Sequence, residues 1–142
     1  KISDVVELKS TCVAQRYIKN PLLIEKKKFD LRIYVLITSV SPLRIYLFRD
    51  GLVRLCTEDY TRPNSRNLGQ VCMHLTNYAI NKFSEKFEVL EQCDVQGESG
   101  SKRSIRWLLT WLRGQCGDSQ VEKLWCKIGD ICVKTIISIT PS

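Results

Sequence analysis

The first half of the chain alternates short apolar runs with turn-forming residues, a pattern that predicts β-strands. The expected strands cover residues 11–18, 29–39, 43–48 and 52–56. Ser41-Pro42 predicts a turn before the third of these strands, and Asp50-Gly51 is a two-residue hairpin signal before the fourth. The last three runs therefore predict an antiparallel meander of three strands.

The apolar residues of the last third of the chain recur at helical spacing. Ser104 is a candidate cap for a first helix, which Gly114 and Gly117 are expected to end. Ser119 and Glu122 have the spacing of a capping box that opens a second helix. The expected apolar stripes are Ile105, Leu108, Leu109 and Leu112 on the first helix, and Val121, Leu124, Trp125, Ile128, Cys132 and Ile136 on the second. The two helices are thus predicted mainly within residues 104–139.

Strands followed by two helices indicate the α+β class, or one piece of a larger α/β domain. Residues 59–70 and 91–101 are polar, contain glycine or proline, and are expected to be loops. A length of 142 residues and a hydrophobic fraction of 44% suit one folded domain. Because the sequence lacks an initial methionine and stops abruptly, we expect residues 1–142 to be a single partial domain, cut from a longer chain at both ends.

Basic residues exceed acidic residues, and the excess lies in the first part of the chain. The net charge is +7 overall, and residues 1–90 hold 15 basic and 9 acidic residues, a net charge of +6. A positive field attracts nucleotide phosphates, nucleic acid or an acidic protein surface. The basic residues do not interleave with aromatic residues in a recognisable nucleic-acid-binding motif, so no nucleic-acid partner is expected.

Seven cysteines, an odd number without any Cys-x-x-Cys spacing, exclude a fully paired disulfide framework. Most of them lie in apolar patterns, so we expect reduced, mostly structural cysteines in a cytosolic protein. No apolar run approaches the ~18 residues of a membrane span, and a single histidine argues against a Cys/His zinc site. We therefore expect neither a membrane partner nor a metal site within this segment.

Charged residues open the strand expected over residues 29–39. Lys28, Asp30 and Arg32 share one face of that strand, because side chains alternate along it. The other face, which is expected to be core, carries Phe29, Leu31, Ile33, Val35 and Ile37. Two interpretations stay open: a solvated face with cross-strand ion pairs, or a polar floor beneath a bound polyanion. Arg54, in a neighbouring strand, either joins this floor or is an ordinary surface arginine.

A second polar cluster, His74-Leu75-Thr76-Asn77-Tyr78, interrupts an apolar stretch. Since buried polar groups need hydrogen-bond partners, this cluster faces either a ligand or a network of its own. A capped turn with a satisfied core histidine is the simpler interpretation of the same residues. For Trp107 and Trp111, four residues apart, we expect packing rather than a ligand cage.

In combination, these segments resemble the tubulin tyrosine ligase-like family over roughly residues 10–140. The matching motifs occur in the family's order at residues 14–18 (AQRYI), 20–24 (NPLLI), 28–36 (KFDLRIYVL), 50–54 (DGLVR) and 73–82 (MHLTNYAINK). Within the family, residues 42–46 (PLRIY) and 100–103 (GSKR) are most similar to the polyglutamylase branch.

The resemblance implies an ATP-grasp fold and an ATP-dependent ligase that joins glutamate to a glutamate side chain of a tubulin tail. In that chemistry ATP phosphorylates a carboxylate and the incoming amine attacks the acyl phosphate, so positive groups stabilise the reacting centre. The implied cofactors are ATP and Mg²⁺, and the implied partners are tubulin or microtubules, through their acidic tails, and free glutamate. The implied localisation is the cytoplasm and cytoskeleton, including the cilium or flagellum and the basal body.

The resemblance also implies a role for each matching residue. The nucleotide site would contain Gln15, Arg16, Tyr17 and Ile18 as a hinge strand that meets adenine, together with Lys28, Asp30, His74, Thr76 and Asn77. Asp30 would lie on the ribose side, and Arg32 is the implied catalytic residue, facing the phosphates or the reacting carboxylate. Arg54, Tyr78 and Lys102 match positions for the incoming amino acid, whose α-carboxylate suits an arginine fork.

The family's magnesium ligands are expected downstream of Ser142, so the isolated 142 residues are expected to be inactive, and unpaired sheet edges are expected to make them poorly soluble. Two alternatives stay open. One is a tubulin-binding scaffold without turnover, and the other is a family member that adds glycine or tyrosine.

Overall fold

The structure, a computed structural model, describes residues 11, 13, 15–87 and 100–139, and it has the α+β architecture expected from the sequence. A four-stranded antiparallel sheet has the order β1-β2-β3-β4. Its strands cover Leu23–Ile24 (β1), Lys27–Val40 (β2), Leu43–Asp59 (β3) and Lys102–Ser104 (β4). The helices cover Val71–His74 (α1), Tyr78–Asn81 (α2), Ile105–Cys116 (α3) and Asp118–Ile137 (α4).

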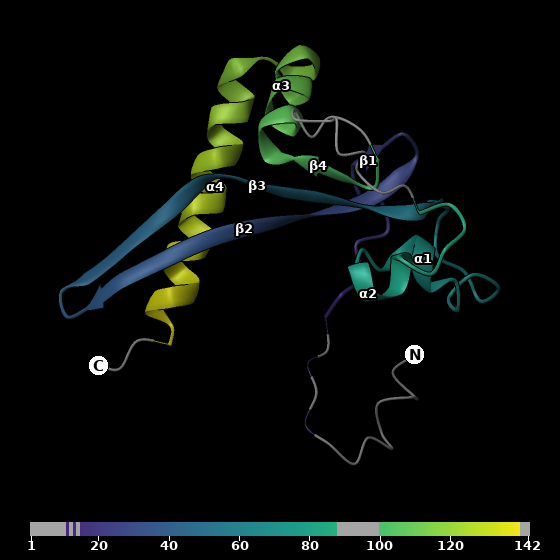
Figure 1. Cartoon of the computed structure of the whole chain (residues 1–142), viewed down its shortest axis with the longest axis horizontal. Coiled ribbons are helices and arrows are strands. Elements are labelled where there is room, and N and C mark those ends of the chain that lie inside the picture. Colours follow the sequence, from purple (N-terminus) through teal and green to yellow (C-terminus); the bar gives the residue numbers. More distant parts are fainter. Residues whose placement is uncertain (1–10, 12, 14, 88–99, 140–142) are drawn as a thin grey trace.

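Strands β2 and β3 form a long hairpin whose turn lies at Ser41-Pro42, as predicted (Figure 1). The turn end of the hairpin projects away from the rest of the molecule, while α1 and α2 lie near its other end (Figure 1). Helices α3 and α4 pack against each other, and α3 contacts β3. The long hairpin thus joins two regions: the helical layer with its core, and the small helices that carry the second polar cluster.

The Asp50-Gly51 hairpin does not form, so the predicted meander of three strands is wrong. Strand β3 continues through both residues, and Gly51 pairs with Ile33 of β2. A Cβ atom at Gly51 would lie 2.3 Å from the carbonyl oxygen of Arg32, so glycine is needed for this close approach of two backbones. The carboxylate of Asp50 accepts a hydrogen bond from the Arg106 amide at 3.3 Å. Pairing in the sheet therefore overrides the turn preference of the dipeptide.

The strand predicted over residues 11–18 is also absent from the described part of that segment. Residues 15–18 are irregular and exposed. The edge of β2 is paired instead by the two residues of β1, which follow Pro21 and are joined to β2 by a tight turn at Glu25 and Lys26. An apolar run becomes a strand only where a neighbouring strand accepts its hydrogen bonds, and none of the described strands pairs with residues 15–18.

The buried core lies between one face of the sheet and helices α3 and α4. Its members are Ile24, Val53, Leu55, Ile105, Leu108, Leu112 and Val121. Phe29, Leu31 and Ile33 pack against this cluster, as the strand alternation predicted. Ile37, also expected in the core, is 44% exposed because it lies toward the hairpin turn, away from the cluster.

The helix boundaries follow the sequence signals only in part. Ser104 caps α3 as predicted, since its hydroxyl accepts a hydrogen bond from the Trp107 amide at 3.0 Å. Gly114 lies within α3, and the helix ends before Gly117, which has a φ of 81°. Helix α4 begins directly afterwards at Asp118, without a side-chain cap bond, so the predicted capping box at Ser119 is wrong. Gly117 joins the two helices so tightly that Ser119 is already helical.

The predicted apolar stripe of α4 faces the protein, and the predicted loops are confirmed where the structure describes them. Val121 and Ile136 are buried, and the other stripe residues, Leu124, Trp125, Ile128 and Cys132, are half-buried. The loop expected over 59–70 begins at residue 60. Most of the loop expected over 91–101 lies outside the described residues.

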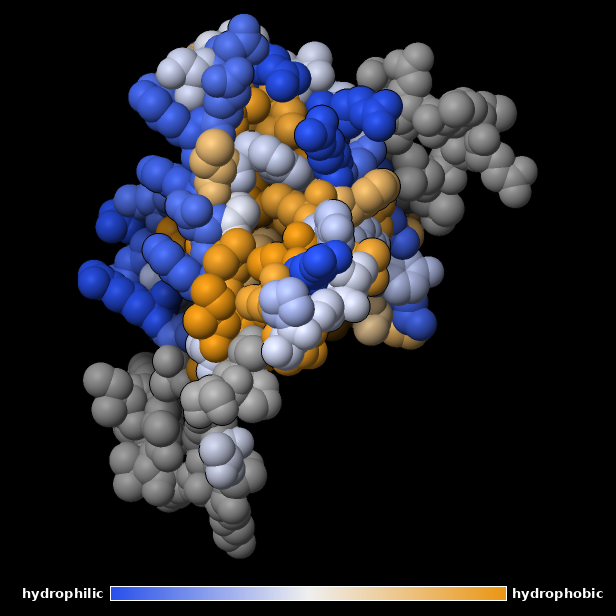
Figure 2. All heavy atoms as spheres, turned by 90° about the vertical axis from the view of Figure 1, so that its left-hand side faces the viewer, coloured by the Kyte–Doolittle hydropathy of each residue, from blue (hydrophilic) through white to orange (hydrophobic). Residues whose placement is uncertain are grey.

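The outer part of the hairpin exposes a group of large apolar side chains. Leu36 is 61% exposed and Phe48 is 60% exposed, and with Tyr34 and Tyr46 they line a hollow of about 500 Å³. Apolar residues gather on the face of the molecule that is seen from the hairpin end, beside a strongly hydrophilic region (Figure 2). An exposed apolar face of this kind favours association, which agrees with the low solubility expected of the isolated chain.

Candidate functional site

The charged residues of β2 share one sheet face with residues of β3 and β4. Asp30 lies directly opposite Arg54 in the β2–β3 ladder, and Arg54 lies directly opposite Lys102 in the β3–β4 ladder. Arg32, two residues further along β2, is exposed on the same face. The sheet register is therefore consistent with the alternation predicted for Asp30 and Arg32, and Arg54 joins this face. Lys28 lies at a register shift of the β2–β3 ladder, between Lys27 and Phe29.

A forked ion pair dominates this face. Arg54 Nε donates to Asp30 Oδ1 at 2.8 Å, and Arg54 Nη2 donates to Asp30 Oδ2. The hydrogen bond to Asp30 raises the pKa of Arg54 above its ordinary value, so the guanidinium is held in its charged form. The pair is half-buried. One edge of the guanidinium is thus used by the protein itself, and two of its five N–H donors are already engaged.

Lys102 connects this face to the second polar cluster. Its ammonium lies 4.0 Å from the centroid of the Tyr78 ring, which is a close cation–π contact. Because Lys102 is also the register partner of Arg54, the three residues that the resemblance assigns to the incoming amino acid come together. They arrive from three different elements, β3, β4 and α2.

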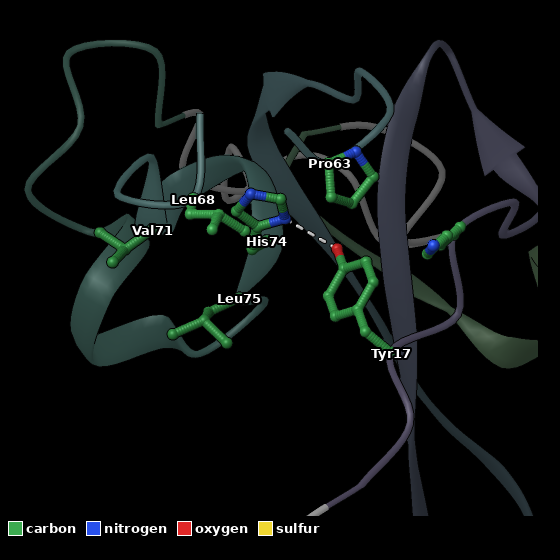
Figure 3. A pocket seen from close by; sticks show the side chains of 7 residues that line it. Tyr17, Pro63, Leu68, Val71, His74 and Leu75 are labelled. Atoms are coloured by element: carbon green, nitrogen blue, oxygen red, sulfur yellow. Dashed lines mark hydrogen bonds between the residues drawn. The ribbon is translucent and has the colours of Figure 1, made fainter. Parts of the chain in front are cut away.

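A second hydrogen-bonded cluster lies at the start of β2. It consists of Tyr17, Lys28 and His74. The Tyr17 hydroxyl lies 2.7 Å from His74 Nδ1 (Figure 3), and Lys28 Nζ donates to the carbonyl oxygen of His74 at 2.8 Å. Lys28 Nζ also lies 3.4 Å from the Tyr17 oxygen and 4.5 Å from the centroid of its ring. Desolvation by burial raises the pKa of Tyr17, so the phenol remains protonated at neutral pH.

The bonds of the His74 ring determine the orientation of this cluster. Nε2 lies 3.0 Å from the carbonyl oxygen of Asn67, which only accepts, so Nε2 carries a proton. In the neutral ring, Nδ1 then accepts from the Tyr17 hydroxyl. His74 is buried with both ring nitrogens engaged, as the interpretation of a satisfied histidine predicted. It ties the segment around Tyr17 to the loop that contains Asn67.

An apolar hollow of about 430 Å³ lies beside this cluster. Its lining includes Leu68, Val71 and Leu75, with Tyr17, Pro63 and His74 (Figure 3). A second hollow of about 640 Å³ is lined by residues 16–20 and Arg62, and it shares Tyr17 and Lys19 with the first hollow. The resemblance assigned the base of a nucleotide to this region, and the first hollow has the volume and apolar walls that such a ring system requires.

The remaining predicted residues lie around these hollows. Arg16 and Ile18 line the second hollow, and Gln15 is exposed at the start of the same segment. Thr76 is buried, whereas Asn77 is exposed and occupies the position before α2. The two residues follow Leu75, which lines the first hollow, but they are not themselves part of its lining.

Two buried residues with an evident role in this architecture, Asn81 and Arg103, were not among the predicted site residues. Asn81 bonds both to β3 and to the segment before α2. Arg103 pairs with Glu25 at 2.7 Å and lies over the ring of Trp107, which fixes β4 and therefore Lys102. For Asn81 the signal in the sequence was a polar residue after the apolar Ala79 and Ile80, whereas β4 is polar throughout and carried no such signal for Arg103. Trp107 and Trp111 stack at 6.3 Å, which confirms their packing role.

The described residues contain no group of three or more His, Cys, Asp or Glu side chains that suits a metal ion. Asp30, the acidic residue of the charged face, is held by Arg54 and does not form part of a carboxylate cluster. The cysteines in the described part of the chain, Cys56, Cys72, Cys116, Cys126 and Cys132, are free thiols, as predicted. No helix in the described ranges has the length and hydropathy needed to cross a membrane.

Comparison with known proteins finds relatives over nearly the whole chain. Tubulin polyglutamylase TTLL7 of Mus musculus is 48% identical over 138 residues, covering 97% of this chain and 14% of the relative. Tubulin polyglutamylase TTLL13 of Mus musculus is 50% identical over 127 residues, covering 89% and 15%. Tubulin polyglutamylase ttll6 of Danio rerio is 46% identical over 129 residues, covering 91% and 16%.

The chain spans only a small part, 14–16%, of the length of these relatives. Nearly all of the chain is nevertheless related to them, and residues 1–141 match the tubulin-tyrosine ligase family as a whole. The chain therefore belongs to the tubulin-tyrosine ligase family.

Proposed function

We propose that this chain is part of an ATP-grasp ligase domain that adds glutamate to glutamate side chains of tubulin tails. One observation carries the proposal: Lys28 and Asp30, on one strand, lie between an apolar hollow and a cluster of cationic side chains. The hollow lies at the Tyr17–His74 cluster, and the cationic cluster consists of Arg54 and Lys102 with Tyr78. Family membership supports the same conclusion, and the three relatives named above are tubulin polyglutamylases.

The hollow would bind the base of ATP, with the backbone of residues 15–18 along its edge. Its apolar walls replace water around the ring system, and Tyr17 is already oriented by His74. Lys28 would meet the nucleotide, Asp30 would lie toward the ribose, and Thr76 and Asn77 would contact it from the opposite rim. We assign Arg32 to the phosphates or the reacting carboxylate, since it is exposed further along the same face.

ATP supplies the phosphoryl group that converts the acceptor carboxylate into an acyl phosphate, and loss of phosphate then accompanies formation of the amide bond. The cationic cluster would hold the incoming glutamate by its carboxylates. Arg54 keeps a second edge of its guanidinium for this purpose, because Asp30 uses only the Nε and one Nη2 donor. A glutamate oriented in this way presents its amine to the acyl carbon at high effective concentration.

Mg²⁺ would be held by residues outside the described segment, downstream of Ser142 as the resemblance implies. The isolated 142 residues are therefore predicted to lack ligase activity. The partners of the whole protein are proposed to be microtubules, whose acidic tails suit the positive charge of residues 1–90, and free glutamate. The corresponding location is the cytoplasm and cytoskeleton, including cilia, flagella and basal bodies.

The test uses the full-length protein that contains these residues. It is incubated with ATP, Mg²⁺, microtubules and radiolabelled glutamate, with glycine and tyrosine in parallel. Arg54→Ala is compared with Arg113→Ala, which removes the same charge from an exposed position at the end of α3. We expect glutamate incorporation that Arg54→Ala abolishes and Arg113→Ala retains.

Other outcomes would change the proposal in defined ways. Incorporation of glycine or tyrosine in place of glutamate would keep the ligase and replace its substrate. Microtubule binding without incorporation of any of the three would indicate a tubulin-binding scaffold. Robust glutamylation by the isolated 142 residues would overturn the assignment of Mg²⁺ to residues outside this segment.

A further inference from the structure

Asn81, at the end of α2, uses the full hydrogen-bonding capacity of its buried side chain. The residue is 1% exposed. Its Oδ1 accepts from the backbone amide and from the hydroxyl of Thr57, each at 3.0 Å. Its Nδ2 donates to the carbonyl oxygens of Leu75 at 2.7 Å and Asn77 at 3.1 Å. Two acceptor positions and two donor positions are the maximum that an amide side chain offers.

These four bonds connect two parts of the structure through Asn81, which lies 24 residues after Thr57 in the sequence. On one side is β3, the central strand that also carries Arg54. On the other side is the segment 75–77, which has neither helical nor strand structure and lies between α1 and α2. The carbonyl group of Leu75 lies outside secondary structure and is bound by the Asn81 side chain, whereas that of Asn77 also accepts from the backbone amides of Ile80 and Asn81 at the start of α2.

The segment that Asn81 holds is the rim of the nucleotide site proposed above. Leu75 lines the apolar hollow, and Thr76 and Asn77 follow it directly. The opposite wall of the hollow is Tyr17, which is held separately through His74. The position of this rim relative to the sheet is therefore set by Asn81.

Other side chains of similar size do not reproduce this arrangement. An aspartate at position 81 keeps the acceptor toward Thr57 but turns a second oxygen toward two carbonyl oxygens, which repel it. A leucine removes all four side-chain bonds, so that the two Thr57 donors and the Leu75 carbonyl group lose their partner at position 81. Asparagine alone, among residues of this volume, presents acceptor and donor pairs on opposite sides.

We propose that Asn81 is a positioning residue for the nucleotide: through its amide it fixes segment 75–77 against β3 and so sets the width of the ATP site. This inference rests on the proposed function, because it assumes that the hollow binds ATP. Of the three residues proposed for the amino acid, Arg54 and Lys102 are placed by strand pairing and by Asp30, and Tyr78 alone belongs to the helix that Asn81 ends. The effect of Asn81 on ATP is therefore expected to exceed its effect on glutamate.

The test compares Asn81→Asp with Ser104→Ala in the full-length protein. Ser104→Ala removes the cap of α3, so it lowers stability without touching segment 75–77. We measure the Kd for ATP by calorimetry, the KM for glutamate and the melting temperature. Asn81→Asp is expected to weaken ATP binding roughly tenfold and to change the KM for glutamate by less than about twofold. Ser104→Ala is expected to lower the melting temperature and leave both constants unchanged.

The outcomes separate this inference from the proposed function. If the wild type binds ATP and Asn81→Asp binds it equally well, the positioning role is overturned and the proposed function stands. If Asn81→Asp raises the Kd for ATP and the KM for glutamate to the same extent, Asn81 has only a structural role and the inference fails. The inference also fails if Ser104→Ala raises the Kd for ATP as much as Asn81→Asp does. If the wild type binds no ATP, the proposed function fails and this inference fails with it.

Discussion

The guanidinium of Arg54 forms a two-point ion pair with the carboxylate of Asp30, directly across the β2–β3 ladder, with Nε 2.8 Å from Oδ1. A forked pair of this kind fixes the plane of the guanidinium before any ligand binds. The two residues belong to different proposed subsites: Asp30 to the nucleotide and Arg54 to the amino acid. Because the ion pair joins the two subsites, a change of charge at Asp30 is expected to affect both of them.

Asp30→Asn is predicted to weaken the binding of both ATP and glutamate, because the neutral amide no longer forms an ion pair with Arg54. We expect the KM for ATP and the KM for glutamate each to rise roughly tenfold, the scale of a charge-assisted hydrogen bond. Steady-state kinetics with labelled glutamate and microtubules measure both constants. Asp118→Asn, at the exposed pair with Arg113, is the matched control. A change in only one of the two constants would show that the ion pair does not couple the subsites.

Tyr17→Phe removes a single hydroxyl from the cluster with Lys28 and His74. We expect about fivefold weaker ATP binding, since a neutral hydrogen bond contributes on the order of 1 kcal/mol. The aromatic wall of the hollow remains. Tyr34→Phe, an exposed tyrosine on the outer hairpin, should leave ATP binding unchanged. Calorimetric titration with ATP measures the effect, and equal affinities for the two variants would contradict the proposed role of the hydroxyl.

Cys56 is predicted to resist alkylation far beyond neutral pH. Burial raises the pKa of its thiol to about 11. The raised pKa favours the protonated form, so at pH 8 only about one thiol in a thousand is the reactive thiolate. Cys116 and Cys126 are exposed and should react first with iodoacetamide. Mass spectrometry of the native protein from pH 7 to pH 10 should show this order, with the Cys56 rate still rising at pH 10. Early modification of Cys56 would contradict the burial described here.

Two glycine substitutions are predicted to have opposite effects on stability. In Gly51→Ala the new Cβ would lie 2.3 Å from the Arg32 carbonyl oxygen and 2.8 Å from Ile105, so we expect a loss of about 3 kcal/mol. Gly129→Ala lies within α4, where the nearest atom to the new Cβ is 3.9 Å away, so a gain of about 0.5–1 kcal/mol is expected. Urea unfolding of both variants measures the difference. A stable Gly51→Ala protein would mean that the two strands are not this close.

Local sequence patterns were sufficient to predict the α+β class, the long strand β2, both long helices and the shared face of Asp30 and Arg32. These features depend on local periodicity: alternation along a strand, apolar spacing along a helix and a serine cap at Ser104. The motifs that resemble the ligase family also identified the family, which the family comparison confirmed over residues 1–141. The individual site roles remain predictions, although the structure brings their residues together.

Only the tertiary structure decided the strand boundaries and the partners of the polar groups. Asp50-Gly51 has the composition of a turn, yet Gly51 lies inside β3 because the backbone of Arg32 passes too close for any side chain. The hydrogen bonds of His74 to Tyr17 and of Asn81 to Thr57 join residues 57 and 24 positions apart. No local pattern encodes such pairs, because a buried polar group is satisfied by whichever partner the fold delivers, and that partner is known only once the sheet and helices have packed.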